Sequence, residues 1–136
     1  VEYVCCIYAT APFIKADYIK AGFEIIKKKK QLFVFSATSF AFPIFRSFAI
    51  NEKEEVQLFW PKNYESRSQD LPEAYHDAGQ FYWGKAEAFK QQKSLFSKSS
   101  TPYILPRYLV QDIDTPEDWK RAELMYQVLK KSGEID

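Results

Sequence analysis

Leu32-Phe33-Val34-Phe35-Ser36-Ala37-Thr38 is a mostly apolar run, rich in phenylalanine, that predicts a buried strand. The chain opens on a similar run, Val1–Tyr8, and apolar residues recur at helical spacing over Ala16–Lys30 between the two runs. Strands that are apolar on both faces are typical of the middle of a parallel sheet. The order predicts a right-handed βαβ unit in an α/β fold with a mainly parallel sheet.

Residues 40–100 depart from this pattern. Short aromatic pieces such as Val56–Trp60 and Gln80–Trp83 alternate there with polar turns. They predict a mixed or antiparallel β excursion, followed by a short helix over Lys85–Gln92.

The last part of the chain predicts extended stretches at Tyr103–Leu105 and Leu109–Ile113 and then a helix. Thr115 is suited to the N-cap, and Pro116 occupies the first helical position without losing a needed hydrogen bond. The predicted apolar face of this helix consists of Trp119, Ala122, Tyr126 and Leu129. No long linker interrupts the sequence, so residues 1–136 are expected to belong to one domain.

The composition excludes several classes of protein. The 136 residues are 46% hydrophobic, which excludes a disordered chain, and the net charge of +1 gives no overall field for nucleic acid or an anionic membrane. No apolar run approaches the ~20 residues of a membrane helix. Cys5 and Cys6 are adjacent, so free thiols in a reducing, cytoplasmic compartment are expected.

Asp112-Ile113-Asp114 is the clearest candidate in the sequence for a catalytic or metal-binding site. At strand spacing the two carboxylates lie on one face, roughly 6–7 Å apart. Two hard oxygen donors suit Mg²⁺, which commonly also binds the phosphates of a substrate. The alternative is that Asp112 is solvated and Asp114 helps Thr115 to cap the helix.

Arg67–Pro72 and the following Glu73–Gly84 gather a guanidinium, amides, carboxylates, the single histidine and aromatic rings. These groups suit a polar, anionic ligand with many hydroxyls. The alternative is a surface loop before an aromatic core strand, with His76 simply hydrogen-bonded. Motifs of serine hydrolases, P-loops and zinc fingers are absent from the sequence.

Three stretches, in this order, resemble the acylneuraminate cytidylyltransferases, or CMP-sialic acid synthetases. They are Tyr8–Phe13, Arg67–Pro72 with the downstream Gly79–Trp83, and Asp112–Asp118. The sequence of His76–Trp83 is most similar to that of the pseudaminic acid cytidylyltransferase branch. Ser68, Ala78 and Ala11 depart from residues common in the sialic acid enzymes and favour the pseudaminic branch.

The resemblance implies a reaction of CTP with a nonulosonic sugar acid, pseudaminic acid or a related sialic acid, to give the CMP-sugar and pyrophosphate. It implies that Asp112 and Asp114 bind Mg²⁺ and are catalytic, and that Thr10 and Pro12 lie near the nucleotide. The residues implied for the sugar-acid pocket are Arg67, Gln69, Asp70, Tyr75, His76, Gln80, Tyr82 and Phe96. A homodimer that uses the β excursion is also implied.

The implied fold is the C-terminal portion of a Rossmann-like nucleotidyltransferase. No stretch of the chain matches the glycine-rich loop that holds the CTP phosphates in the family, so residues 1–136 alone are expected to be a poor catalyst. A non-catalytic sugar- or nucleotide-binding module is the alternative function.

Overall fold

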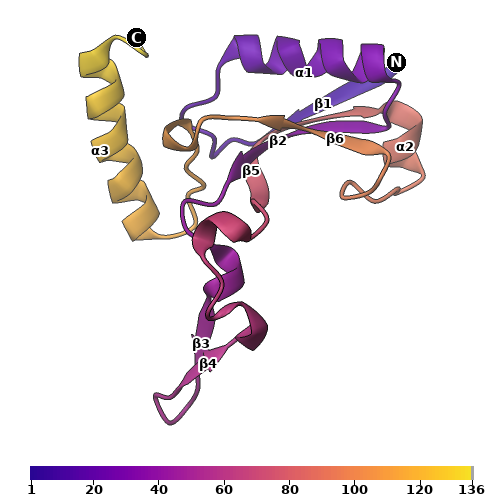
Figure 1. The fold of residues 1–136 in the computed structure, drawn as a ribbon. Coiled ribbons are helices and arrows are strands. Elements are labelled where there is room, and N and C mark those ends of the chain that lie inside the picture. Colours follow the sequence, from indigo (N-terminus) through magenta and orange to yellow (C-terminus); the bar gives the residue numbers. More distant parts are fainter. Residues whose placement is uncertain (136) are drawn as a thin grey trace. The chain divides into compact units, whose positions relative to one another are not determined.

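The computed structural model describes residues 1–135 and divides the chain into two units. The first unit comprises residues 1–38 and the chain from residue 77 onward, and the second comprises residues 39–76. A four-stranded sheet in the order β1–β5–β2–β6 organises the first unit (Figure 1). The strands are β1 (Tyr3–Ile7), β2 (Phe33–Ser39), β5 (Tyr75–Lys85) and β6 (Ser100–Ile104).

The sheet is mixed, and most of its pairings are antiparallel. β1 pairs antiparallel with β5, whereas β2 and β6 are parallel. The backbone N–H of Lys85 donates to Leu32 O at 3.0 Å, and that of Phe81 donates to Ser36 Oγ at 3.1 Å. Since residue numbers fall along β5 as they rise along β2, these two strands are also antiparallel. The α/β prediction is confirmed, but the prediction of a mainly parallel sheet is wrong. β1 and β2 share one direction, and β5 lies between them.

β1 is an edge strand of this four-stranded sheet, which differs from the predicted central position. Val4 and Ile7 are 40% and 50% exposed. The continuous apolar run predicted burial on both faces, whereas burial depends on which elements cover a strand.

α1 (Ala16–Lys29) covers one face of the sheet (Figure 1). The indole N–H of Trp83 donates to Ile19 O at 2.8 Å. A Cβ atom at Gly22 would lie 2.7 Å from a ring carbon of Phe81, so the helix approaches β5 closely because position 22 has no side chain.

The two remaining helices described in the first unit pack against other residues than α1 does. Phe89 of α2 (Ala86–Lys90) makes an edge contact with Phe33, with 5.1 Å between ring centroids. α3 (Pro116–Ser132) buries Ala122 and Leu129 against Phe13 and Leu109, the last residue of the 3₁₀ turn η4 (Arg107–Leu109). The predicted Thr115 N-cap is confirmed, and the helix ends before Gly133 in the left-handed conformation.

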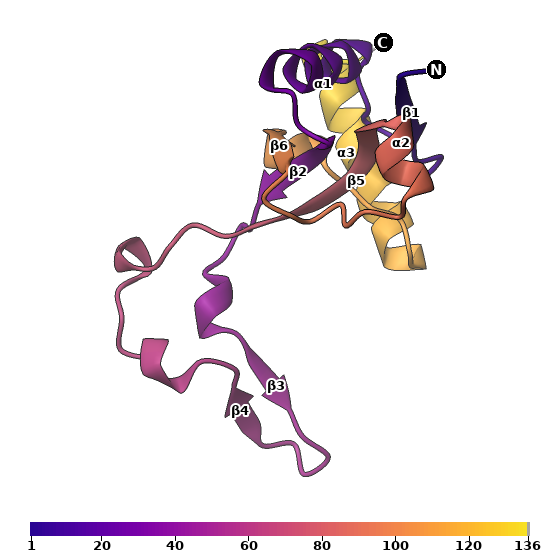
Figure 2. The same ribbon diagram turned by 90° about the vertical axis from the view of Figure 1, so that its right-hand side faces the viewer.

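The second unit contains the antiparallel hairpin β3 (Phe48–Ile50) and β4 (Val56–Leu58), shown in Figure 2. Three 3₁₀ turns flank it: η1 (Ile44–Arg46), η2 (Pro61–Asn63) and η3 (Ser68–Asp70). The β excursion therefore ends at His76 rather than near residue 100, because β5 rejoins the main sheet.

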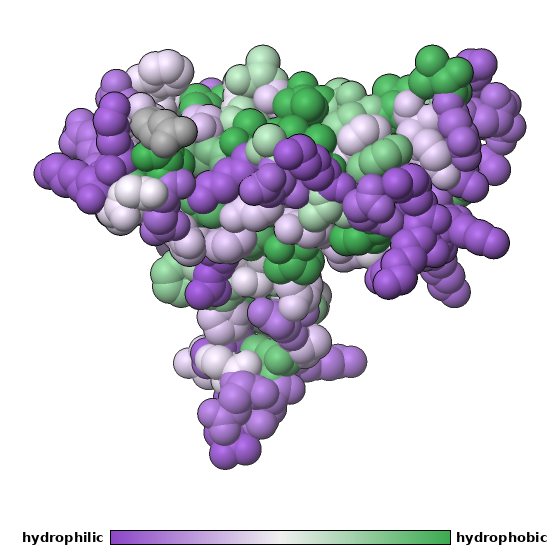
Figure 3. All heavy atoms as spheres, turned by 90° about the horizontal axis from the view of Figure 1, so that it is seen from above, coloured by the Kyte–Doolittle hydropathy of each residue, from purple (hydrophilic) through white to green (hydrophobic). Residues whose placement is uncertain are grey.

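The outer side of α1 carries exposed lysines in its last turn. Figure 3 looks onto this side and shows hydrophilic side chains gathered where α1 ends, at the right of the view. Among the helices of residues 1–135, none combines the length and the apolar character that crossing a membrane requires.

Phe81 tests whether β5 is the centre of the first unit. Its side chain is 0% exposed, so Phe81→Ala removes a full ring from the core and should lower the free energy of unfolding by about 3–5 kcal/mol. The control Phe42→Ala changes a side chain that is 82% exposed and should leave chemical denaturation almost unchanged. Equal losses in the two variants would contradict this assignment of the core.

Candidate functional site

Three segments of the first unit meet at Gly79 and Gln80 of β5. The carbonyl of Gln80 accepts a hydrogen bond from Tyr8 N–H at 3.0 Å, which ties the turn after β1 to this point. The side-chain Nε2 of Gln80 donates to Leu109 O at 2.6 Å, which ties down the segment that leads to Asp112. The predicted nucleotide turn and the segment that precedes the predicted metal ligands are thus both hydrogen-bonded to Gln80.

Gly79 has a backbone conformation that differs from regular β-structure. Its φ is +61°, and its N–H donates to Asp77 Oδ1 at 2.9 Å. A Cβ atom at this position would lie 3.4 Å from Cγ of Asp112. The Asp112 carboxylate therefore lies beside the backbone of β5, on the side where Gly79 lacks a side chain.

Asp112 and Asp114 lie in the loop between η4 and α3, not on a strand. The prediction of an extended stretch over Leu109–Ile113 is wrong, because Leu109 closes a 3₁₀ turn and the following residues have no regular structure. The separation derived from strand spacing consequently does not apply. Both aspartates are exposed, and Oδ1 of Asp112 accepts the N–H of Ile113 at 3.1 Å.

The N-terminus of α3 fixes the other end of this loop. Thr115 Oγ1 accepts the N–H of Asp118 at 3.2 Å, and Asp118 Oδ2 accepts the N–H of Thr115 at 2.9 Å and that of Asp114 at 3.3 Å. Asp118, rather than the Asp114 side chain, thus completes the capping box. Hydrogen bonds from Thr115, the hydroxyl first, lower the pKa of Asp118.

Asp112 and Asp114 carry the type of donor with which proteins usually bind magnesium. Within residues 1–135 no three His, Cys, Asp or Glu side chains are grouped to hold a metal ion. Mg²⁺ commonly uses one or two protein carboxylates and completes its coordination with water and substrate phosphates. Asp112 and Asp114 supply exposed, hard oxygen donors of the required kind.

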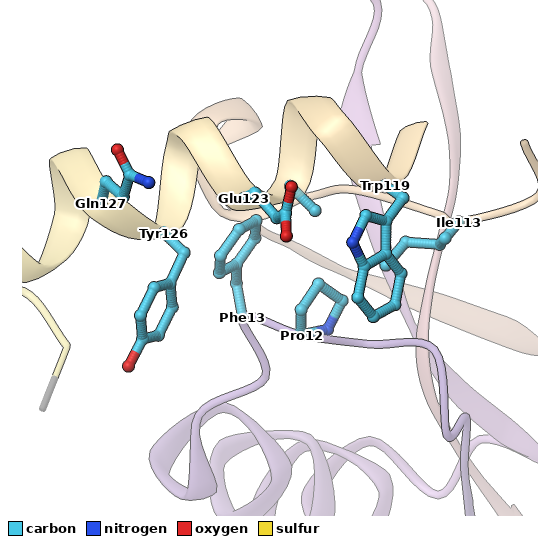
Figure 4. A pocket seen from close by; sticks show the side chains of 8 residues that line it. Pro12, Phe13, Ile113, Trp119, Glu123, Tyr126 and Gln127 are labelled. Atoms are coloured by element: carbon cyan, nitrogen blue, oxygen red, sulfur yellow. The ribbon is translucent and has the colours of Figure 1, made fainter. Parts of the chain in front are cut away.

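A pocket of about 390 Å³ lies between the turn after β1 and α3 (Figure 4). Pro12 and Phe13 form one side of it, and Trp119 and Tyr126 project from α3 on the other. Ile113, the residue between the two aspartates, also lines the pocket. The structure therefore places Pro12, predicted near the nucleotide, beside the Asp112–Asp114 loop. Thr10 is exposed in the same turn.

Three residues predicted for the sugar-acid pocket belong to the first unit. Gln80 is 1% and Tyr82 is 6% exposed, so both are largely enclosed by protein. The Tyr82 hydroxyl donates to Asp77 Oδ2 at 2.6 Å, and its pKa is raised by burial and by this carboxylate. Phe96 is exposed and makes an edge contact with Phe35, 5.0 Å between ring centroids.

Asp77, which the sequence did not single out, contacts Gly79 and Tyr82 of the candidate site. Its carboxylate joins Gly79 to Tyr82, and the Asp77-Ala78-Gly79 pattern could have indicated it, because an aspartate two residues before a glycine often caps a local turn.

The second unit holds the other predicted sugar-acid residues. Nε of Arg67 donates to Asp70 Oδ2 at 2.8 Å, and Gln69 lines a hollow of about 250 Å³ with Phe40 and Pro72 among its walls.

Tyr75 and His76 lie at the end of the second unit. The Tyr75 hydroxyl donates to Glu73 Oε2 at 2.6 Å, and this bond raises the pKa of Tyr75. The ring of His76 packs 4.7 Å from that of Phe40. The structure thus gathers Arg67, Gln69 and Asp70 in one turn, and it gathers the nucleotide and metal candidates in the first unit.

Comparison with known proteins confirms the resemblance. No family model matches the chain. The chain is similar to a protein of Campylobacter jejuni named pseudaminic acid cytidylyltransferase, with 44% identity over 132 residues, which cover 97% of this chain and 57% of the relative. The protein of the same name from a second strain gives the same values.

A longer relative comes from Helicobacter pylori. It is named pseudaminic acid cytidylyltransferase and UDP-2,4-diacetamido-2,4,6-trideoxy-beta-L-altropyranose hydrolase, and it is 34% identical over 131 residues, covering 96% of this chain and 25% of the relative. The chain thus spans little more than half the length of the Campylobacter relatives that it matches.

The cap beside Asp114 predicts a pH-dependent stability. Because the pKa of Asp118 is lowered on folding, its carboxylate stabilises the fold above the pKa of the unfolded chain, and this contribution is lost as pH falls through the lowered value. Asp118→Asn should therefore lower the melting temperature near neutral pH, with the difference vanishing in acid. Glu117→Gln, which leaves the capping box intact, is the control. A deficit that is independent of pH would contradict the assignment.

Proposed function

We propose that the protein transfers the cytidylyl group of CTP to a nine-carbon α-keto sugar acid, pseudaminic acid or a close relative. The anomeric oxygen of the sugar forms a bond to the α-phosphorus of CTP, the bond from this phosphorus to the bridging oxygen breaks, and pyrophosphate leaves. The hydroxyl proton is released to a base or to water. The products are the CMP-sugar and pyrophosphate.

The observation that carries the proposal is 44% identity, across almost the whole chain, to proteins named for this activity. The turn after β1 is bonded to Gln80 and Asp112 lies beside Gly79, which supports it, since a nucleotide and its metal need adjacent sites. The names of the relatives favour a transferase over a non-catalytic binding module.

Asp112 and Asp114 would hold Mg²⁺, which when bound offsets the charge that develops on the phosphate oxygens. The side chain of Gln80 in β5, bonded to Leu109 O, and the cap of α3 restrain this loop from its two ends. Such restraint favours catalysis, because preorganised groups need little rearrangement when the charge develops.

Arg67 is proposed to bind the carboxylate of the sugar acid. A guanidinium presents a planar fork that matches a carboxylate, and Arg67 already uses this geometry toward Asp70, with Nε at 2.8 Å and Nη2 at 3.4 Å. Gln69 supplies an amide to the neighbouring hollow and suits hydroxyls of the sugar.

We also propose a Rossmann-like nucleotidyltransferase fold and a homodimer. The hairpin of the second unit exposes Phe48, Ile50 and Val56, which are 51%, 66% and 65% exposed and suit burial against a second copy. A cytoplasmic location belongs to the same proposal and is supported by the free thiols of Cys5 and Cys6.

Asp112→Asn tests the metal assignment in the full-length protein. Loss of one anionic ligand should slow magnesium-dependent release of pyrophosphate, with CTP and pseudaminic acid as substrates, by about 100-fold or more. The control Asp17→Asn changes an exposed acid of α1 and should retain full activity. Undiminished turnover by Asp112→Asn would refute the assignment.

Arg67→Lys tests recognition of the sugar acid. A lysine keeps the charge but not the fork, so the KM for pseudaminic acid should rise about tenfold while the KM for CTP stays the same. The melting temperature should change little, because the Arg67–Asp70 ion pair is exposed. Lys53→Gln, in an exposed turn of the same unit, is the matched control. A parallel rise in both KM values would argue against this role.

A further inference from the structure

We infer that Gly79 is a positioning residue for the Asp112 carboxylate, because its missing side chain leaves the space beside which that carboxylate lies. The inference rests on the proposed role of Asp112 as a metal ligand. It concerns a residue of β5 that has no side-chain group to offer a substrate or a metal.

The contact is specific to the Asp112 side chain. The three atoms nearest to a Cβ built on Gly79 are Cγ, Oδ2 and Oδ1 of Asp112, at 3.4, 3.5 and 3.6 Å. A methyl group would just touch the carboxylate, and any longer side chain extending this way would occupy its place. The hydrogen atom of Gly79 therefore lets the carboxylate lie close to the strand without displacement.

The loop cannot easily move away as a whole, because the segment before it is fastened to two strands. Leu105 N–H donates to Ala37 O at 2.7 Å, and Thr38 Oγ1 donates to Leu105 O at 2.8 Å. Further along, Leu109 O accepts from Gln80 Nε2. A side chain at position 79 should consequently displace the carboxylate of Asp112 rather than the entire segment.

The backbone of Gly79 is also held in place. Its φ of +61° lies in the left-handed region, and Asp77 Oδ1 accepts its N–H. Among residues with side chains, asparagine adopts this conformation most readily. Gly79→Asn therefore adds steric bulk toward Asp112 with little change in backbone preference.

Gly133 provides a matched control. It also has a positive φ, +75°, but a Cβ at this position would meet no atom within 4 Å. Gly133→Asn makes the same chemical change in the same backbone region, without a carboxylate in contact.

The experiment measures binding of Mn²⁺ alone to the full-length protein, from the electron paramagnetic resonance signal of the free ion, alongside steady-state kinetics. Gly79→Asn should raise the dissociation constant for Mn²⁺ about tenfold or more and lower kcat, with the KM for CTP changed by less than about twofold. Gly133→Asn should match the native protein in all three quantities. If Gly79→Asn does not fold, as judged by its melting curve, Gly79→Ser and Gly133→Ser replace the pair with the same expectations, because a serine extends beyond the Cβ atom that would just touch the carboxylate.

Three results would overturn the inference. The first is native Mn²⁺ affinity in the folded Gly79 variant, and the second is an equal loss of affinity in the Gly133 control. The third is native Mn²⁺ affinity in Asp112→Asn, which would remove the metal assignment itself. The absence of pyrophosphate release by the native protein would refute the proposed function, whereas the Mn²⁺ measurement would still test Gly79.

Discussion

The first unit depends on the insertion of one antiparallel strand, β5, between two strands that share the opposite direction. β5 pairs with β1 along one side, and on the other it donates backbone N–H groups to Leu32 O and Ser36 Oγ. Phe81 is fully buried in its middle. The turn after β1 and the segment that leads to Asp112 are hydrogen-bonded to β5 or to its neighbour β2. The positions of the candidate residues therefore depend on the register of β5.

Buried polar groups set that register. Ser36 Oγ accepts the N–H groups of both Gln80 and Phe81 at 3.1 Å, a function that a backbone carbonyl would perform in a regular ladder. Gln80 is buried too, and its Oε1 has no hydrogen-bond partner among the described residues. Such a group costs about 1–3 kcal/mol, partly offset by the bond from Nε2 to Leu109 O. Polar interactions of this kind penalise any shift of the strand, because a shift would leave more buried groups without partners.

The sequence predicted the elements whose signals are local. Helical spacing indicated α1, and Thr115 with Pro116 indicated the start of α3, since capping depends on residues within one turn. Strand pairing is not local, because an apolar run can lie beside any partner that reaches it. The aromatic residues of Gln80–Trp83 indicate only a short strand, because the polar residues Tyr75–Asp77, which begin β5, give no strand signal. The prediction of a mainly parallel sheet is wrong for this reason.

In the candidate site too, the sequence indicated which residue types take part but not where the fold places them. Residue type and spacing indicated the carboxylates of Asp112 and Asp114, but the strand on which their geometry was based is a loop. The role of Gly79 follows from a contact across the fold, which no pattern within β5 contains. Arg67 and Asp70 belong to a unit with its own hairpin and turns, and their ion pair lies within three residues. Changes at that pair should therefore act on the sugar acid without disturbing the bond from Gln80 to Leu109 O or the contact of Asp112 with Gly79.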